Sequence, residues 1–301
     1  MRAFLLFAIT LISLTPGLLP QTHAQGVPPG VRALRDLAYV DHGHDRQKLD
    51  LYLPDSAVSG APLPLIIWIH GGGWKSGDKR QCPAIRFARE GYAVASIGYR
   101  LSEDAVFPAQ IEDCKAAIRW LRVHAAEYHL DPDRFAAWGS SAGGHLVALL
   151  GVTGKTREFD VGANLKTSSA VQLVIDFYGP ADFLTMGSMS GPQSRLDHDA
   201  PDSPEAKLLG GAIQKNPGLA RRASPITYVQ AGAPPFLIVH GDADQTVPVG
   251  QSKLLDEKLR AAGNRSTLHI VKGGGHGTLF GPEVFRLTED FLNTHLKPVA
   301  Q

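Results

Sequence analysis

The sequence predicts an α/β protein whose mostly parallel sheet of about eight strands is covered by helices on both faces. Continuous apolar runs such as Leu63–Ile69 and Phe236–Val239 have the length of strands and do not alternate between polar and apolar residues. Such runs are typical of parallel strands that are buried on both faces. Stretches with helical periodicity lie between them and supply the crossovers that parallel strands require.

The strands expected from these runs fall along the whole chain. Leu37–Val40 and Leu49–Leu53 form a two-stranded start, joined by the polar turn 41–47. The others are expected, in chain order, at Leu63–Ile69, Tyr92–Tyr99, Phe135–Trp138, Val171–Tyr178, Phe236–Val239 and Leu268–Val271. The last three are predicted to be buried strands.

The clearest helix begins at Pro108, because apolar residues recur after it every three or four positions and form one buried stripe, Ile111, Cys114, Ile118, Leu121 and Ala125. Asp131-Pro132-Asp133 predicts a turn from this helix into the next strand. Further helices are expected at about Pro83–Arg89, Gly144–Leu150, Val249–Ala262 and Pro282–Leu296.

Residues 184–233 break this alternation, because they are long and rich in Gly, Ser, Pro and Asp. Short helical pieces are expected within them at 204–209 and 217–222. The stretch is either a surface loop or an insertion that forms a lid or a pocket wall. Residues 25–301 are therefore expected to form one α/β domain that carries this insertion.

The first 24 residues have the composition of a secretory signal peptide. Arg2 provides the positive start, Ala3–Leu14 is an almost unbroken apolar run, and Thr22-His23-Ala24 offers small residues around a cut after Ala24. A retained membrane anchor is the alternative, but the run is too short to span a bilayer comfortably. We expect an exported protein, secreted or periplasmic, without a stable membrane anchor.

Charge and cysteine content bound the function further. A net charge of +1 with 20% charged residues and no polybasic block gives no reason to expect a nucleic acid partner. Cys82 and Cys114 are in an exported chain, where a disulfide can persist. They are expected on helices that cover opposite faces of the sheet, in which case they are too far apart to bridge.

Gly139-Ser140-Ser141-Ala142-Gly143 fits the nucleophile-elbow pattern G-x-S-x-G at the end of an apolar run. In this turn a strand passes at once into a helix and holds its central residue at positive φ, so that larger residues two positions away would collide. The pattern selects Ser141 as the nucleophile, because Ser140 is flanked at that distance by Trp138 and Ala142. An ordinary Gly/Ser turn is the alternative.

His70-Gly71-Gly72-Gly73-Trp74 directly follows the strongest predicted strand. Successive glycines let the backbone approach a ligand and turn N–H groups toward it. Together with the amide of Ala142, the amides of Gly72 and Gly73 are candidates for an oxyanion hole. A plain glycine-rich turn or a phosphate loop is the alternative, and no lysine follows at P-loop spacing.

His276 is the candidate base among 12 histidines, because Gly273-Gly274-Gly275-His276-Gly277 follows a strand and lies downstream of Ser141. A flexible loop at the end of a strand presents an imidazole to a cleft. His70, His145 and His240 are expected to have structural roles instead, with His240 bonded to the backbone.

Asp244 is the candidate acid that orients this base, since it lies in the turn after the strand Phe236–Val239. Asp242 is in the same turn and is the alternative. Asp244 lies further into the loop and is better placed to reach the histidine, whereas Asp242 is expected to close the turn.

These motifs, in the order serine, acid, histidine, resemble the α/β-hydrolase fold and within it the carboxylesterases with an H-G-G-G loop, such as the hormone-sensitive-lipase-like and the bacterial feruloyl or acetyl-xylan esterase groups. The similarity covers about residues 37–296 and includes Gly179-Pro180-Ala181-Asp182-Phe183. It implies the nucleophile, base, acid and oxyanion donors named above. A large helical cap before the first strand is missing from the resemblance, which favours the exported polysaccharide esterases.

The sequence thus predicts a secreted serine esterase that cleaves carboxylic esters through an acyl-enzyme, without metal or organic cofactor. Its expected substrates are small-molecule or polysaccharide-linked esters, with acetyl or feruloyl groups of plant polysaccharide favoured. A serine peptidase, an arylformamidase and an inactive binding protein on this fold are the alternatives. Trp74, Tyr99 and Phe183 either line the substrate pocket or pack in the core.

Overall fold

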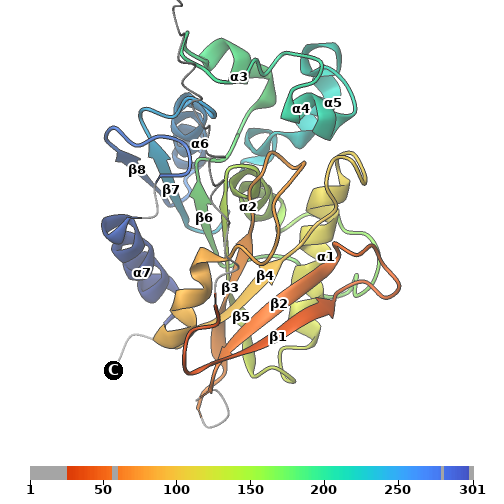
Figure 1. The fold of residues 1–301 in the computed structure, drawn as a ribbon, viewed down its shortest axis with the longest axis vertical. Helices are drawn as coiled ribbons and strands as arrows, with labels where there is room; N and C mark the ends of the chain where they lie inside the picture. Colours follow the sequence, from red (N-terminus) through yellow and green to blue (C-terminus); the bar gives the residue numbers. More distant parts are fainter. Residues whose placement is uncertain (1–25, 56–59, 279–280, 298–301) are drawn as a thin grey trace, which may run out of the picture.

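The computed structural model describes residues 26–55, 60–278 and 281–297, so the predicted signal peptide lies outside the described residues. Within them, one eight-stranded sheet has the order β1-β2-β4-β3-β5-β6-β7-β8 (Figure 1). β2 is antiparallel to both of its neighbours, and the remaining pairs are parallel. The strands are β1 Val31–Ala38, β2 Lys48–Pro54, β3 Leu63–Ile69, β4 Ala93–Ile97, β5 Leu130–Ser140, β6 Leu173–Phe177, β7 Phe236–Gly241 and β8 Ser266–Val271.

Helices cover both faces of this sheet, and each face has its own apolar core. In β3, Leu65 and Ile67 face one core, whereas Ile66 and Trp68 face the other, as the alternation of side chains along a strand requires. The first core is shared with α1 Ala109–Val123, α2 Ala142–Thr153 and α6 Gly250–Ala261. The second is shared with the 3₁₀ helix η2 Pro83–Glu90 and with α7 Pro282–Leu296. The predicted fold class is confirmed.

Three local expectations differ from the structure. β1 begins at Val31 and not at Leu37. The predicted turn 131–133 lies inside β5, where the register with β3 jumps from Leu130 to Phe135 while β3 advances by two residues. The segment is therefore a bulge in a continuous strand. β8 is half-exposed instead of buried, because it is the last strand of the sheet and has a neighbour on one side only.

The two cysteines belong to different cores. Cys82, at the start of η2, packs in the second core, and Cys114 of α1 packs in the first. Both thiols are free and buried. The sheet between them prevents the disulfide that the exported environment would otherwise permit.

The 184–233 stretch forms short helices at one end of the molecule, above α2 in Figure 1. These are α3 Phe183–Met189, α4 Pro204–Leu209, η3 Ile213–Lys215, α5 Pro217–Ala223 and η4 Pro225–Tyr228. His145 of α2 anchors them, since its Nε2 donates to the carbonyl of Ala223 over 2.7 Å. None of the helices in the described part of the chain is long and apolar enough to cross a membrane.

A buried carboxyl group lies beneath the first turn of α2. Oδ1 of Asp176, in β6, accepts a hydrogen bond from the amide of Gly179 over 2.9 Å, while Oδ2 has no partner among the described residues. A Cβ at Gly144 would lie 2.4 Å from the same Oδ1, so the helix packs directly on this side chain. Burial raises the pKa of Asp176 to about 7, although the Gly179 amide favours the charged form.

Replacing Asp176 with Asn should change how stability depends on pH. The unfolded chain loses this proton near the ordinary pKa of 3.8, whereas the folded protein keeps it up to about pH 7. The free energy of unfolding of the native protein therefore falls as pH rises between these values. Asp176→Asn removes that loss and should stabilise the fold at pH 8 relative to pH 4, by up to about 4 kcal/mol.

Urea unfolding from pH 4 to pH 8 measures this difference, and Asp133→Asn at an exposed position provides the control. Parallel pH profiles for the native protein and Asp176→Asn would contradict the account.

Candidate active site

Ser141 occupies the sharp turn between β5 and α2, with φ of 55° and ψ of −120°. Its amide donates to the carbonyl of Phe177 over 2.8 Å, which holds the turn against β6. The glycines around it are required by close backbone approaches. A Cβ at Gly139 would lie 2.3 Å from the carbonyl oxygen of Gly143, and a Cβ at Gly143 would lie 2.1 Å from that of Ile69. A side chain at either glycine would therefore collide with backbone atoms, and at Gly143 these belong to β3.

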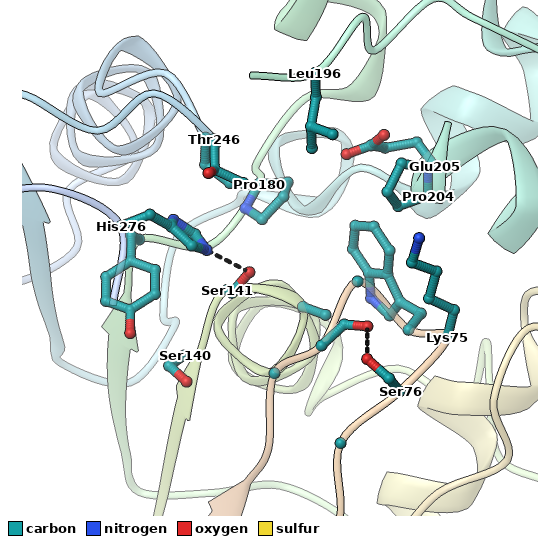
Figure 2. A pocket seen from close by; sticks show the side chains of 18 of the residues that line it. Lys75, Ser76, Ser140, Ser141, Pro180, Leu196, Pro204, Glu205, Thr246 and His276 are labelled. Carbon is teal, nitrogen blue, oxygen red and sulfur yellow. Dashed lines mark hydrogen bonds between the residues drawn. The ribbon is translucent and has the colours of Figure 1, made fainter. Parts of the chain in front are cut away.

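The structure brings Ser141, His276 and Asp244 together, from three loops at the carboxyl ends of β5, β8 and β7. His276 Nδ1 is 2.7 Å from Asp244 Oδ2, and His276 Nε2 is 3.0 Å from Ser141 Oγ (Figure 2). Because the carboxylate accepts a hydrogen bond from Nδ1–H, Nε2 is unprotonated and can accept the hydroxyl proton of the serine. This is the geometry of a nucleophile with an oriented base.

Asp244 is held in its charged form. Its side chain is 1% exposed, and its Oδ1 accepts from the amides of Thr246 and Val247 over 2.7 and 3.0 Å. Burial alone would raise the pKa of this carboxyl. Hydrogen bonds from His240 and His276 outweigh burial and hold the pKa well below its usual range.

The alternative acid, Asp242, has a different position. Its Oδ1 accepts a hydrogen bond from the amide of Gly273 over 2.6 Å and so joins the loop after β7 to the loop after β8. It joins two loops and does not close its own turn as was expected, and Asp244 is the carboxylate that reaches His276.

His240 contributes more than the expected backbone bond. Its Nε2 lies 3.0 Å from the carbonyl of Val247 and 3.3 Å from Asp244 Oδ2, and its Nδ1 lies 2.7 Å from Ser252 Oγ. Because two acceptors face Nε2, that nitrogen carries the proton and Nδ1 accepts from the serine. His240 therefore contacts the same carboxylate oxygen of Asp244 as His276 does and helps to hold it in place. The four-residue spacing from His240 to Asp244 within one turn is the sequence signal that could have identified it.

Tyr178 is a second residue that sequence analysis did not select. Its backbone has φ of 47°, and its ring lies edge-on to the His276 ring at 4.7 Å between centroids. The contact limits the positions that the imidazole can take. The preceding strand and the following Gly179-Pro180 marked a strand end here, but nothing in the sequence indicated that the tyrosine would touch His276.

The loop after β3 lies beside Ser141. Gly72 and Gly73 have positive φ, 111° and 58°, and a Cβ at Gly72 would lie 2.3 Å from the carbonyl oxygen of Ser76. The amide of Ser76 closes the loop by donating to the Gly72 carbonyl over 3.1 Å. No acceptor among the described residues is bonded to the amides of Gly72, Gly73 or Ala142, and all three residues line the cavity around Ser141.

His70 and His145, the two histidines near this loop, have structural positions. His70 is buried, its Nδ1 is 2.8 Å from the Gly71 carbonyl, and its ring stacks on Tyr99 at 4.4 Å. Burial lowers the pKa of His70 to about 4. His145 accepts from Trp74 Nε1 over 3.2 Å, and burial lowers its pKa to about 4 as well. Both are therefore neutral at physiological pH.

A cavity of about 610 Å³ opens over Ser141 and His276. The 184–233 insertion supplies one wall, with Leu196, Pro204 and Glu205 on the side away from Ser141 (Figure 2). Among the three aromatic candidates, Trp74 lines the cavity. Tyr99 packs on His70, and Phe183 stacks on His145 at 5.0 Å.

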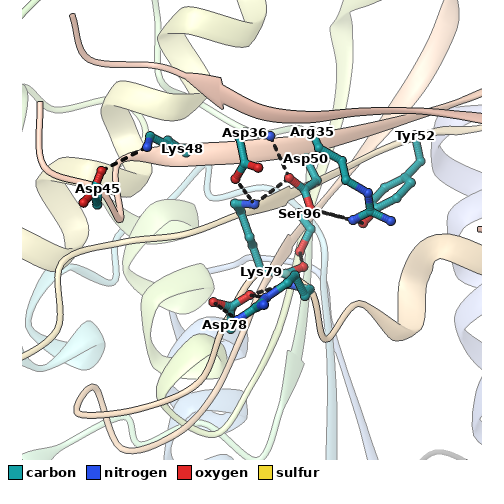
Figure 3. Close-up of polar contacts among 10 residues, drawn as sticks. Arg35, Asp36, Asp45, Lys48, Asp50, Tyr52, Asp78, Lys79 and Ser96 are labelled. Carbon is teal, nitrogen blue, oxygen red and sulfur yellow. Dashed lines mark hydrogen bonds and ion pairs between the residues drawn. The ribbon is translucent and has the colours of Figure 1, made fainter. Parts of the chain in front are cut away.

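No cluster of three or more His, Cys, Asp or Glu side chains suited to a metal ion occurs in the described residues. A separate charged group lies on the sheet. Asp50 of β2 is buried there between Lys79 and Arg35, at 2.6 and 3.1 Å (Figure 3). Asp50 also accepts from the amide of Asp36, so the cluster is satisfied by its own contacts and stabilises the β1–β2 end of the sheet.

This sheet order, the serine turn and the neighbouring histidine and carboxylate define an α/β-hydrolase fold. The chain belongs to the BD-FAE family, whose model matches residues 49–259.

Individual relatives agree with this class. The chain is 33% identical to the esterase LipC of Mycobacterium tuberculosis over 260 residues, covering 83% of this chain and 63% of LipC. It spans 53–63% of the length of the mycobacterial relatives LipC, LipM and LipQ. A truncated carbohydrate esterase from gut microbiota superposes with a TM-score of 0.81 and 33% identity, covering 89% of this chain and 97% of that one. A bifunctional GH43-CE protein of Bacteroides eggerthii superposes with a TM-score of 0.80 and 34% identity, covering 88% of this chain and 35% of that one.

Replacing Asp244 and Asp242 in turn should separate their roles. Asp244→Asn reverses the hydrogen bond that orients His276 and should lower kcat for p-nitrophenyl acetate by about 10⁴-fold. Asp242→Asn weakens a contact between two loops. It should lower the thermal midpoint and change kcat little. Steady-state rates and melting curves measure both. A greater loss of kcat in Asp242→Asn than in Asp244→Asn would overturn the assignment.

Proposed function

We propose that the protein is a serine esterase in which Ser141 attacks the ester carbonyl and His276 removes its proton. The distance of 3.0 Å between His276 Nε2 and Ser141 Oγ carries this proposal. Asp244 fixes the imidazole so that Nδ1 holds a proton and Nε2 is basic. The imidazolium that forms is stabilised by the buried carboxylate.

The carbonyl oxygen becomes an oxyanion in the first step. We assign its stabilisation to the amides of Gly72, Gly73 and Ala142, the last of which lies at the N-terminus of α2. A donor of this kind contributes about 3–4 kcal/mol to the transition state. His276 then returns its proton to the leaving alcohol, and water releases the acyl group by the same route.

The proposed substrates are acetyl or feruloyl esters of plant polysaccharide. The names of two similar structures, a carbohydrate esterase and a GH43-CE protein, support this class. A cavity of about 610 Å³ has room for a sugar beside the reacting ester. Export to the periplasm or the medium is part of the proposal and rests on the signal-like residues 1–24.

Ser141→Ala should abolish hydrolysis of p-nitrophenyl acetate, since among the described residues Ser141 is the one whose hydroxyl is hydrogen-bonded to His276. A fluorophosphonate probe should label the native protein and Ser140→Ala covalently and leave Ser141→Ala unlabelled. Ser140 is the matched control because it is adjacent in sequence and points away from His276 (Figure 2). Labelling of Ser141→Ala would rule out this nucleophile.

A panel of acyl chains tests the substrate class. Acetyl and feruloyl esters should give higher kcat/KM than octanoyl esters, because an esterase of polysaccharide side groups has no need of a long alkyl slot. A maximum at octanoyl, measured by product release under identical conditions, would indicate a lipase-like enzyme instead.

A further inference from the structure

A buried histidine and a buried glutamate form part of the cavity wall that the 184–233 insertion supplies. The side chains of His198 and Glu205 are 0% and 3% exposed, and His198 Nδ1 is 3.1 Å from Glu205 Oε1. Both residues line the cavity that contains Ser141 and His276. Neither takes part in the proposed chemistry.

Each member of this pair keeps one polar atom unused. His198 Nε2 and Glu205 Oε2 are buried and have no hydrogen-bond partner among the described residues. Buried polar groups in folded proteins are nearly always paired, because an unpaired one costs free energy. A pair that served only to hold the insertion together would be expected to satisfy these atoms as well.

The pair is fixed in place on both sides. Ser203 caps α4 by accepting from the amide of Ala206, which sets the backbone of Glu205. Pro204 lies against the oxyanion loop, where a Cβ at Gly73 would be 3.3 Å from it. Figure 2 shows the Glu205 carboxylate beside Leu196, across the cavity from Ser141. The Glu205 carboxylate therefore lies in the wall of the cavity that a substrate bound at Ser141 enters.

The charge state of the pair favours a neutral polar ligand. Burial lowers the pKa of His198, but the hydrogen bond and the negative charge of Glu205, together with the nearby Thr246 carbonyl and the charge of Asp199, outweigh it, so that the pKa is raised overall. Nδ1 donates to the carboxylate in either protonation state. Nε2 then donates when His198 is protonated and accepts when it is neutral, while Oε2 accepts.

We propose that His198 and Glu205 form a subsite that binds hydroxyl groups of a sugar on the alcohol side of the ester. The inference rests on the proposed esterase function and extends it to the leaving group. A hydroxyl both donates and accepts, so two neighbouring hydroxyls of one sugar ring satisfy Oε2 and Nε2 at once. Leu196, in the same cavity, offers apolar surface to the C–H groups of the ring.

The test compares two acetate esters that differ in the alcohol. Glu205→Gln removes the charged acceptor and keeps the shape of the side chain. It should lower the ratio of kcat/KM for a mono-O-acetyl methyl β-D-xylopyranoside to kcat/KM for p-nitrophenyl acetate by about tenfold or more, as loss of a hydrogen bond to a charged group does. Glu257→Gln, at an exposed position of α6, should leave that ratio unchanged.

A second measurement is independent of turnover. Saturation-transfer NMR should detect methyl β-D-xylopyranoside on Ser141→Ala, and the signal should weaken at least severalfold in Ser141→Ala/Glu205→Gln. If the native protein hydrolyses neither acetate but the sugar still binds in this Glu205-dependent way, the esterase function fails and the subsite stands.

Three results would overturn the subsite. One is an equal fall in kcat/KM for both acetate esters in Glu205→Gln while the thermal midpoint stays unchanged. Another is the absence of any sugar signal on Ser141→Ala. The third is a fall in kcat/KM of Glu205→Gln for methyl ferulate but not for methyl cinnamate, which would assign the pair to the phenolic hydroxyl of the acyl group.

Discussion

The close approach of three backbone segments at Ser141 is the constraint on which the site depends. β3, β5 and the first turn of α2 come so near one another that a Cβ at Gly139 or Gly143 would lie within 2.3 Å of a carbonyl oxygen. This crowding forces the serine to positive φ and lifts its hydroxyl above the sheet. The strain is carried by a sheet that is buried on both faces, so the surrounding core holds the turn in place.

Around this turn, the acid and the base are each held by a second residue. His240 bonds the carboxylate of Asp244, and Tyr178 packs against the ring of His276. His240 is in turn fixed by Ser252 of α6. The orientation of the imidazole is thus determined by side chains from β7, α6 and the end of β6, and not by Asp244 alone.

Most of the fold and of the candidate site could be predicted from the sequence, because both produce local patterns in it. Continuous apolar runs located the parallel strands, and β3 and α7 have the predicted bounds. Glycine patterns located Ser141, Gly72 and His276, since the first lies between glycines where a Cβ would collide with backbone, the second is itself such a glycine, and the third lies between Gly273 and Gly277, both at positive φ. The bulge at 131–133 was missed because pairing with β3 overrides the local preference of Asp-Pro-Asp for a turn.

What the sequence could not supply are contacts between distant segments. Tyr178 and His276 are 98 positions apart, and the pairing of His198 with Glu205 depends on how the insertion folds back over the cavity. Likewise, the half-exposure of β8 follows from its place at the margin of the sheet, which its composition does not reveal.

The bond from His145 to Ala223 has a consequence for how this scaffold can diversify. Trp74, in the loop after β3, donates to His145, which donates to the end of α5, so the second half of the insertion is bonded to that loop through α2. Residues 190–203 have no such tether to α2 in the described structure. Insertions and deletions there would reshape the cavity while sparing the oxyanion loop, whereas changes near Ala223 would disturb both together.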